Sequence, residues 1–407
     1  MSLNTEMFSR ERLAGYGPEC LARAAALVVG AGALGQNVAQ NLALAGVGEI
    51  RIVDKDEFEP HNRTRSPAYP LAEEVARFGL QKARAVASKL RPMMTNSNPL
   101  MRYADNWIEE LGDGAFKNAS VVLSCVDKPS ARAYLSDQAR FHSKPFIEGG
   151  FDGAEITLST YPATDGEASV VTPCWRCSHQ DIAGAFSCDF YAEEVERAGF
   201  VPAIQNAAAT LAGLQCEAAI TALHQRTAAF DARAFDLNIR TGRSLIVKLS
   251  TDPACPGIHR ALDIPPVSLS TTADQTVADL LQELTEDLND SPTIILRTPL
   301  VWSAACVACE QMSNVRQPAW AWEASPKCTN CGGPFPPNDL EAANSAIVYT
   351  QITNDSDSEL LSLSCRQIGL PPLSIVEVAV RRGASTFFEL AGSIDHLFNS
   401  GDAYERQ

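Results

Sequence analysis

Residues 27–54 read LVVGAGALGQNVAQNLALAGVGEIRIVD, and they pass from an apolar run through a glycine turn and a helical pattern to a second β-rich run. This order predicts a strand, a tight turn, a helix and a second strand. Gly30 and Gly32 allow the turn to approach a phosphate, and Gly35 allows the helix to pack on the first strand. Asp54 follows 22 residues after Gly32, where its carboxylate can accept hydrogen bonds from ribose hydroxyls. The stretch predicts a nucleotide site, and a glycine turn that serves packing alone is the alternative.

The composition describes a globular chain with a large negative charge. Its 407 residues and hydrophobic share of 45% allow two or three domains with buried cores. A net charge of -16 and an isoelectric point near 4.9 argue against nucleic acid or an anionic membrane as the main partner. No run of 18 apolar residues lacks a charge, and the N-terminus MSLNTEMFSR has no hydrophobic signal core. We therefore expect a cytoplasmic protein.

Apolar patterns predict an α/β domain over residues 1–264 and an α+β domain over residues 265–407. Residues 1–23 read as an arm with no core pattern of its own, and residues 265–272 read as a linker. Ligands bind open α/β sheets at the carboxyl ends of the strands, so Gly32, Asp54 and Asp127 are expected at one edge. The patterns predict helices at 71–90, 130–141, 203–224 and 277–288, and strands at 120–126, 145–149, 154–161, 234–239 and 244–249.

Four polar side chains favour ATP over a nicotinamide cofactor at this edge: Asn62, Arg65, Lys82 and Asp127. Attack on ATP needs cations that neutralise the phosphates and an acidic ligand for Mg²⁺, whereas an NAD-dependent oxidoreductase has no need of both. Taken singly, Arg65 and Lys82 can be surface charges, and Asp127 can be the N-cap of the next helix. Their convergence predicts a Mg·ATP site.

The ordered motifs of residues 8–262 resemble those of the ThiF/MoeB/ubiquitin-activating-enzyme superfamily. The motifs are Ser9-Arg10, VVGAGALG, Asp54-x-Asp56, Asn62-x2-Arg65, Gly79-x2-Lys82-Ala83, Asp127-x4-Arg132 and paired cysteines. The resemblance implies a doubly wound, Rossmann-like ThiF adenylation fold with an embedded zinc site. It also implies that the C-terminal glycine of a ubiquitin-like or sulfur-carrier protein attacks the α-phosphate of Mg·ATP and releases pyrophosphate.

The resemblance also implies roles for residues of this chain, with the ribose on Asp54, Mg²⁺ on Asp127 and Arg10 reaching the partner subunit of a homodimer. Two positions depart from the usual motifs, since Ser66 stands where Gln commonly occurs and Lys128 stands where Asn often occurs. Neither departure removes a charge that adenylation needs. Carried over by position, the implied nucleotide and Mg²⁺ contacts are Gly30, Gly32, Gly35, Asp54, Asp56, Asn62, Arg65, Lys82 and Asp127.

The spacing of the twelve cysteines predicts two Zn²⁺ ions per chain rather than disulfides. The first site combines Cys174-x2-Cys177 with Cys255-x3-His259, and His179 competes with His259 as the fourth ligand. The second site is a zinc ribbon over residues 306–331, with the spacing Cys306-x2-Cys309-x18-Cys328-x2-Cys331. Such a site can contribute on the order of 10 kcal/mol to a module with little core.

Cys188 is a candidate nucleophile, because family members that form a thioester or persulfide carry their cysteine in a crossover loop of this region. Its neighbours Asp189, Glu193 and Glu194 argue against that role. Carboxylates raise the pKa of a nearby thiol and so reduce the thiolate that attacks. The role of Cys188 stays open at this point.

The interpretation that accounts for most of these features is an activating enzyme for a ubiquitin-like protein, whose C-terminal domain recruits a carrier or a conjugating enzyme. An adenylyltransferase for a sulfur-carrier protein of thiamine or molybdopterin synthesis differs only in its partner. An NAD-dependent oxidoreductase is favoured by Asp54 and disfavoured by Arg65, Lys82 and Asp127. A zinc scaffold without catalysis leaves Arg65, Lys82 and Asp127, at the expected phosphate edge of the sheet, unexplained.

Overall fold

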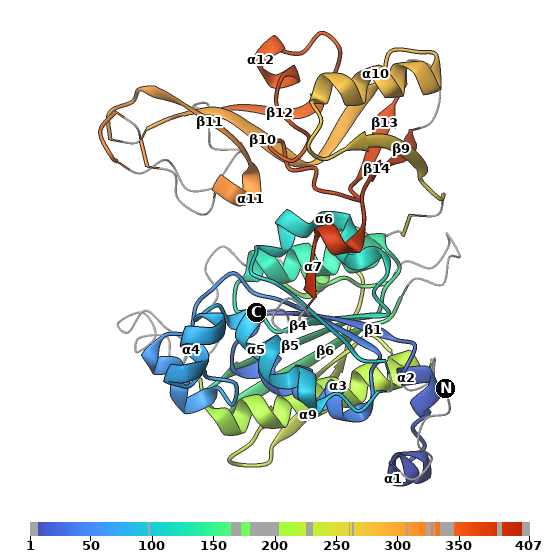
Figure 1. The fold of residues 1–407 in the computed structure, drawn as a ribbon, viewed down its shortest axis with the longest axis vertical. Coiled ribbons are helices and arrows are strands. Elements are labelled where there is room, and N and C mark those ends of the chain that lie inside the picture. Colours follow the sequence, from blue (N-terminus) through green and yellow to red (C-terminus); the bar gives the residue numbers. More distant parts are fainter. Residues whose placement is uncertain are drawn as a thin grey trace. The chain divides into compact units, whose positions relative to one another are not determined.

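The computed structural model divides the chain into two compact units (Figure 1). One comprises residues 1–108, 115–263 and 398–407, and the other comprises residues 109–114 and 264–397. In the described part of the chain, no helix combines the length and the apolar character needed to cross a membrane. The residues that the structure describes are 7–96, 98–163, 172–179, 203–224, 231–259, 261–262, 264–306, 308–322, 327–328, 330–333, 346–380 and 385–400.

The first unit is built on a mixed sheet that, within the described residues, has nine strands in the order β15-β3-β2-β1-β4-β5-β6-β7-β8. The strands from β3 to β5 are parallel, and those at either side are antiparallel to their neighbours. The order β3-β2-β1-β4-β5 is that of a doubly wound sheet, which confirms the predicted α/β class. The bounds are β1 (Ala25–Val29), β2 (Glu49–Val53), β3 (Leu100–Ala104), β4 (Val121–Ser124), β5 (Phe146–Asp152), β6 (Glu155–Tyr161), β7 (Arg233–Asn238), β8 (Ser244–Lys248) and β15 (Asn399–Ser400).

Helices cover both faces of the parallel strands, with α3 and α9 on one face and α7 on the other (Figure 1). Because both faces are covered, every residue of β1 and β4 is buried, as is typical of parallel sheets. The helix predicted at residues 203–224 is confirmed as α9. The bounds are α1 (Ser9–Leu13), α2 (Pro18–Leu21), α3 (Ala33–Ala45), α4 (Ala72–Phe78), α5 (Lys82–Leu90), α6 (Ile108–Lys117), α7 (Pro129–Phe141) and α9 (Gln205–Leu223), with short 3-10 helices η1 (Pro60–Arg65), η2 (Arg91–Met93) and η3 (Trp175–Ser178).

The single helix predicted over residues 71–90 is wrong, because the chain breaks it into α4 and α5. Gly79 lies between them with a φ of +77°, a conformation that L side chains rarely adopt. The residues that follow pair with the loop after β2, where the Phe58 N–H donates to the Leu80 carbonyl at 2.8 Å. This break places Lys82 at the first position of α5.

The N-terminal arm has more structure than its sequence predicts. Phe8 is buried, and a Cβ on Gly46 would lie only 3.0 Å from its ring. Farther along, the Gly17 N–H donates to His224 Nε2 at 2.6 Å, which fastens α2 to the end of α9. The described part of the arm is therefore anchored at Phe8 and at Gly17, while most of α1 stays exposed.

The second unit contains a six-stranded sheet in its described part, in the order β11-β10-β13-β14-β9, with β12 also paired to β10. The predicted linker is wrong, because most of it forms β9, which pairs in parallel with β14. The predicted helix 277–288 is confirmed as α10, which begins at a capping box between Thr276 and Asp279. The bounds are β9 (Val267–Thr272), α10 (Val277–Leu288), β10 (Thr293–Ala305), β11 (Met312–Pro318), α11 (Ala319–Trp322), β12 (Ala346–Ile352), α12 (Ser358–Leu361), β13 (Ile375–Ala379), β14 (Thr386–Ala391) and η5 (Ile394–His396).

The packing of the glycine turn predicts unequal losses of stability for two alanine substitutions. A Cβ on Gly35 would lie 1.8 Å from the Gly30 carbonyl oxygen, whereas a Cβ on Gly32 would have no atom within 4 Å. We expect Gly35→Ala to lower the free energy of unfolding by about 1–3 kcal/mol or more, the usual cost of overpacking. Gly32→Ala should leave it nearly unchanged. Urea titrations of both variants measure this, and equal midpoints would contradict the packing role of Gly35.

Candidate functional site

In the glycine turn between β1 and α3, Gly30 permits close packing and Gly32 leaves the start of the helix open. A Cβ on Gly30, whose φ is +95°, would lie 2.5 Å from the Cys125 carbonyl oxygen, so this residue allows the turn to touch the end of β4. Gly32, in contrast, is the N-cap of α3 and borders open space. An open helix N-terminus presents free N–H groups and the positive end of the helix dipole, which suits a phosphate.

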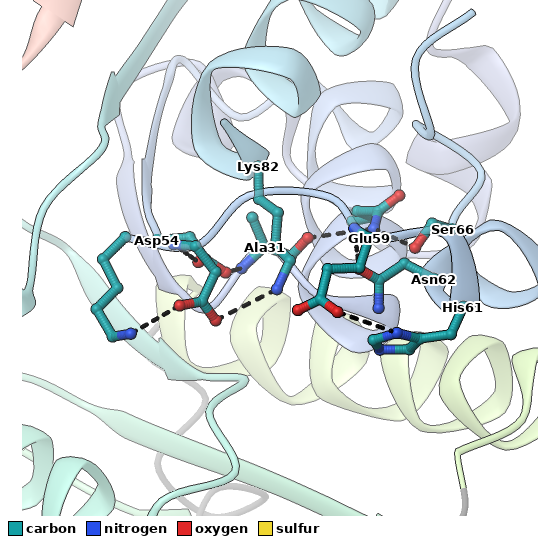
Figure 2. A network of polar contacts seen from close by, with 10 residues as sticks. Ala31, Asp54, Glu59, His61, Asn62, Ser66 and Lys82 are labelled. Carbon is teal, nitrogen blue, oxygen red and sulfur yellow. Dashed lines mark hydrogen bonds and ion pairs between the residues drawn. The ribbon is translucent and has the colours of Figure 1, made fainter. Parts of the chain in front are cut away.

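Asp54 joins this turn to the end of β2 (Figure 2). One oxygen of its carboxylate accepts the Ala31 N–H at 2.6 Å, and the other accepts the Asp56 N–H at 2.8 Å. Burial raises the pKa of Asp54, against the opposing effects of Lys82 and of the two N–H groups. The carboxylate therefore holds the turn and the following loop in one arrangement.

Lys82 extends from the start of α5 toward the same edge, where its Nζ lies 3.3 Å from Asp56 Oδ2 (Figure 2). Lys55 Nζ lies 2.7 Å from the other oxygen of Asp56. Burial would raise the pKa of Asp56, but the two lysines outweigh it and hold that pKa below its usual value. A cation is disfavoured at a helix N-terminus. Helix stability therefore does not explain the position of Lys82.

Asn62 and Arg65 lie on η1, beside the turn. The Asn62 side chain is buried, and its oxygen accepts the Glu59 N–H at 2.9 Å. Arg65 is half-buried and donates to the His61 carbonyl at 3.2 Å. Both side chains are thus held by hydrogen bonds within their own loop.

Asp127 follows β4 and is exposed. The N-cap of α7 is Lys128, and no side chain accepts a hydrogen bond there, so Asp127 does not serve as the cap. Lys128 instead shares the ring of Trp107, which follows β3, with Lys55: the two Nζ atoms lie 5.1 and 4.2 Å from the ring centroid. Side chains that follow β2, β3 and β4 thus meet at one edge, and Trp107 is a member that the sequence analysis missed.

One candidate residue, Arg10, is not brought to this edge of the sheet. Arg10 lies on the exposed α1, and no hydrogen bond or ion pair found among the described residues joins it to Asp54 or Lys82. Cys188 lies outside the described residues. Of the other cysteines, Cys125 and Cys216 have pKa values that burial raises, which reduces the thiolate fraction of each.

The first cysteine cluster gathers the predicted ligand set. The Sγ atoms of Cys174, Cys177 and Cys255 and a ring nitrogen of His259 all lie within 4.8 Å of one another, a group that could hold a metal ion. His259 Nε2 lies 3.1 Å from Cys177 Sγ. His179 is held elsewhere, because its ring stacks on Trp175 at 4.2 Å and its Nδ1 lies 2.9 Å from the Trp175 carbonyl oxygen.

Helix α7 supports this cluster through a residue that the sequence analysis missed. Asp137 accepts the Ile258 N–H at 3.1 Å with one oxygen and Arg176 Nε at 3.0 Å with the other. It thereby ties the segment that carries His259 to the segment that carries Cys177. Burial lowers the pKa of His259, which favours the neutral imidazole that a metal binds. An aspartate within a helix is too common a feature to have identified this role from the sequence.

The second cluster lies in the second unit and brings together four thiols that could hold a metal ion: Cys306, Cys309, Cys328 and Cys331. The Cys306 and Cys331 sulfurs are 3.5 Å apart, and those of Cys309 and Cys328 are 3.7 Å apart. Backbone N–H groups of residues 331 and 330 hold the pKa of Cys328 below its usual value, which favours the thiolate.

A family model described as the ThiF family matches residues 10–257, more than half of the chain. The chain belongs to the ThiF family. This confirms the expected resemblance on the segment that carries the glycine turn, Asp54, Lys82 and Asp127.

Relatives of this ThiF-family chain include two adenylyltransferases. It is 33% identical over 163 residues to the adenylyltransferase and sulfurtransferase uba4 of Pyricularia oryzae, covering 39% of this chain and 31% of that protein. It is 29% identical over 191 residues to the sulfur carrier protein ThiS adenylyltransferase of Bacillus subtilis, covering 46% of this chain and 54% of that protein. The chain thus spans about a third to about half of the length of these relatives.

Among solved structures, E. coli MccB with MccA-N7isoASN matches 63% of this chain and 75% of that one, with a TM-score of 0.50 and 18% identity. At this identity the likeness shows the fold alone.

The departure of this ThiF-family member at Ser66 is explained by Gln36, a second residue that the sequence analysis missed. Gln36 is buried at the start of α3, and its Nε2 donates both to the Ala31 carbonyl and to Ser66 Oγ, each at 3.1 Å. Its Oε1 accepts the Ala68 N–H at 2.8 Å. Gln36 therefore links the glycine turn to the loop that carries Asn62 and Arg65. A polar residue amid the apolar side chains of α3 was its only signal in the sequence.

This link predicts unequal costs for two substitutions. Gln36→Leu leaves the Ala68 N–H and the Ala31 carbonyl without this partner, and should lower the free energy of unfolding by about 2–3 kcal/mol. Ser66→Ala removes a single bond and should cost about 1 kcal/mol or less. Urea titration of both variants is the measurement. A cost of Ser66→Ala as large as that of Gln36→Leu would contradict the assigned network.

Proposed function

We propose that this chain is an ATP-dependent adenylyltransferase that activates the C-terminal glycine of a ubiquitin-like or sulfur-carrier protein. The proposal is carried by one observation: an open glycine turn, Asp54 and the largely buried cation Lys82 meet at the carboxyl edge of the parallel strands of a ThiF-family domain. The adenylyltransferase names of the relatives support it.

In the proposed reaction, the C-terminal carboxylate forms a bond to the α-phosphorus of ATP as the bond from that phosphorus to the bridging oxygen of the β-phosphate breaks. Pyrophosphate leaves with that electron pair. The protein contributes mainly position and charge. We assign the ribose to Asp54, the phosphates to Asn62, Arg65 and Lys82, and Mg²⁺ to Asp127.

Asp127 fits the assigned role because it is exposed at the strand edge and does not cap α7. Carboxylate oxygen is a preferred ligand of Mg²⁺, which keeps several waters and binds through one or two carboxylates together with substrate phosphates. Mg²⁺ bound there would neutralise charge that develops on the phosphates.

Two acceptor classes fit this site equally. The name of the Bacillus relative favours a sulfur carrier, and the motifs of residues 8–262 also favour a ubiquitin-like protein. Pyrophosphate exchange with purified glycine-tailed proteins of each class decides between them. Thioester transfer through Cys188 to a conjugating enzyme belongs to the second class and stays a prediction. An NAD-dependent oxidoreductase is disfavoured by the family.

Two lysines of α5 give a matched test of the nucleotide site. Lys82 points to the candidate phosphate edge, whereas Lys89, on the same helix, pairs with Glu74 at 2.9 Å. Lys82→Met should weaken ATP binding about tenfold to a hundredfold, because a hydrogen bond to a charged group contributes about 1.5–3 kcal/mol. Lys89→Met should bind ATP as the wild type does. Calorimetric titration with Mg·ATP measures both, and equal affinities would sink the assignment of Lys82.

We further propose that each cysteine cluster holds one Zn²⁺, since three or four thiolates with one or no imidazole suit a closed, structural zinc site. Two histidines test the first cluster. His259→Ala should release the zinc of that cluster alone, whereas His179→Ala should retain both ions, because His179 stacks on Trp175 instead. Metal analysis of the purified variants gives the answer. Retention of both ions in His259→Ala would mean that another group completes the site.

We also propose that the chain forms a homodimer, in which the exposed Arg10 acts in the partner's site. Losing one charge-assisted contact to a developing phosphate charge should cost about 2–4 kcal/mol of transition-state stabilisation. A mixture of Arg10→Ala and Asp127→Ala chains tests this, because in a heterodimer one site carries both defects and the other carries neither. Pyrophosphate exchange should partly return. If subunits exchange and activity stays absent, Arg10 does not act across the interface.

A further inference from the structure

The end of β4 is held more firmly than strand pairing requires. This end is the segment 124–126, which leads directly to Asp127. The Cys125 N–H donates to the Val29 carbonyl at 2.8 Å, which continues the pairing with β1. The backbone carbonyls of its neighbours Ser124 and Val126 each accept a hydrogen bond from a side chain on a helix.

The two side chains come from opposite faces of the sheet. Gln215 of α9 is fully buried and donates from Nε2 to the Ser124 carbonyl at 3.1 Å. Its oxygen accepts the thiol of Cys125 at 3.7 Å. Arg132 of α7 donates from Nε to the Val126 carbonyl at 3.0 Å. Figure 1 places α9 and α7 on the two faces.

Consecutive glycines in β5 make room for both side chains. A Cβ on Gly149 would lie 2.6 Å from the side-chain amide of Gln215, and a Cβ on Gly150 would lie 2.9 Å from a guanidinium nitrogen of Arg132. Successive residues of a strand point to opposite faces. The two glycines therefore leave room for one side chain on each face of the sheet, beside the end of β4.

A buried carboxylate orients the arginine. Glu148 lies opposite Ser124 in the register of β4 and β5, and it points to the same face as Gly150. Its side chain is only 2% exposed and forms an ion pair with Arg132. A buried carboxylate must be paired and hydrogen-bonded. Glu148 therefore keeps the guanidinium group of Arg132 in place, so that Arg132 Nε can donate to the Val126 carbonyl.

We propose that Arg132, oriented by Glu148, and Gln215 are positioning residues that fix where Asp127 stands relative to the glycine turn. The inference rests on the proposed function, in which Asp127 binds Mg²⁺. The segment that they hold also touches Gly30, since a Cβ there would meet the Cys125 carbonyl. Releasing either carbonyl lets the Asp127 loop shift against the turn. The contribution of Mg²⁺ to ATP binding then falls, while the contacts of ATP alone stay.

The test is calorimetric titration of the full chain with ATP, once in Mg²⁺-free buffer without a chelator, so that the proposed zinc ions stay bound, and once in excess Mg²⁺. The ratio of the two dissociation constants reports the contribution of the metal. Gln215→Leu and Arg132→Lys should each reduce this ratio about three- to tenfold, the size of coupling expected between groups that share contacts. Affinity in the Mg²⁺-free buffer should stay within about twofold of the wild type. Lysine still pairs with Glu148, but it lacks the planar fork that serves both partners.

Gln205→Leu is the matched control. Gln205 lies on α9 as Gln215 does and bonds a side chain of another helix, Asn37, at 3.2 Å, but not β4. For Gln205→Leu, the ratio of the two ATP dissociation constants should equal that of the wild type. A loss as large as that of Gln215→Leu would overturn the proposal.

Combination with Asp127→Ala separates positioning from general stability. Asp127→Ala alone should reduce the ratio most, and Gln215→Leu or Arg132→Lys added to it should change the ratio by less than about twofold, because both act through Asp127. The inference is overturned if Gln215→Leu or Arg132→Lys lowers the ratio as much in Asp127→Ala as in the wild type. It is also overturned if the folded single variants have the wild-type ratio. Neither result contradicts the proposed function. A wild-type ratio for Asp127→Ala overturns both. The two variants act from opposite faces, so either decides if the other does not fold.

Discussion

The hydrogen bond from the Ala31 N–H to the Asp54 carboxylate is the contact on which the candidate site depends. It joins the glycine turn after β1 to the end of β2, and the second oxygen of Asp54 extends the link to the Asp56 N–H. Turn and loop therefore cannot shift independently. Burying this carboxylate costs free energy, as its raised pKa reflects, and Lys82 and the two N–H groups offset part of that cost. Gln36 and the residues at the end of β4 then attach the remaining loops to the same turn.

The first cysteine cluster joins segments that are far apart in the sequence, and the second borders a small core. The first joins η3 to residues 255–259 and is tied to α7 through Asp137, so it closes long connections of the sheet. The second lies beside a small core that contains Val301, Ala304 and Trp322. A metal at such a place supplies folding free energy that a small core cannot. Neither cluster shares a residue with the phosphate edge, which agrees with a structural role for both.

Local patterns made part of this fold predictable. The β1-α3-β2 unit and α10 follow from apolar periodicity, the glycine turn and a capping box, all of which are written in neighbouring residues. The rest depends on distant partners. The break at Gly79 is stabilised by the loop after β2, and β9 forms only by pairing with β14. For the same reason the spacing left His179 as a competitor of His259, and the contacts of His259 with the cluster and of His179 with Trp175 separate them.

The charge balance explains why Asp56 lies among the cations of the phosphate edge. A chain with a net charge of -16 repels an anionic nucleotide at long range, so its cations must be held close together to attract one within about a Debye length, ~8–10 Å. Lysines gathered without an anion would repel one another, and Lys82, whose side chain is only 14% exposed, would lack a partner. Asp56 pairs with both Lys55 and Lys82 and removes that cost. In the proposed reaction, a phosphate oxygen can replace one carboxylate oxygen at Lys82, an exchange of like for like that leaves the ammonium charged and oriented throughout.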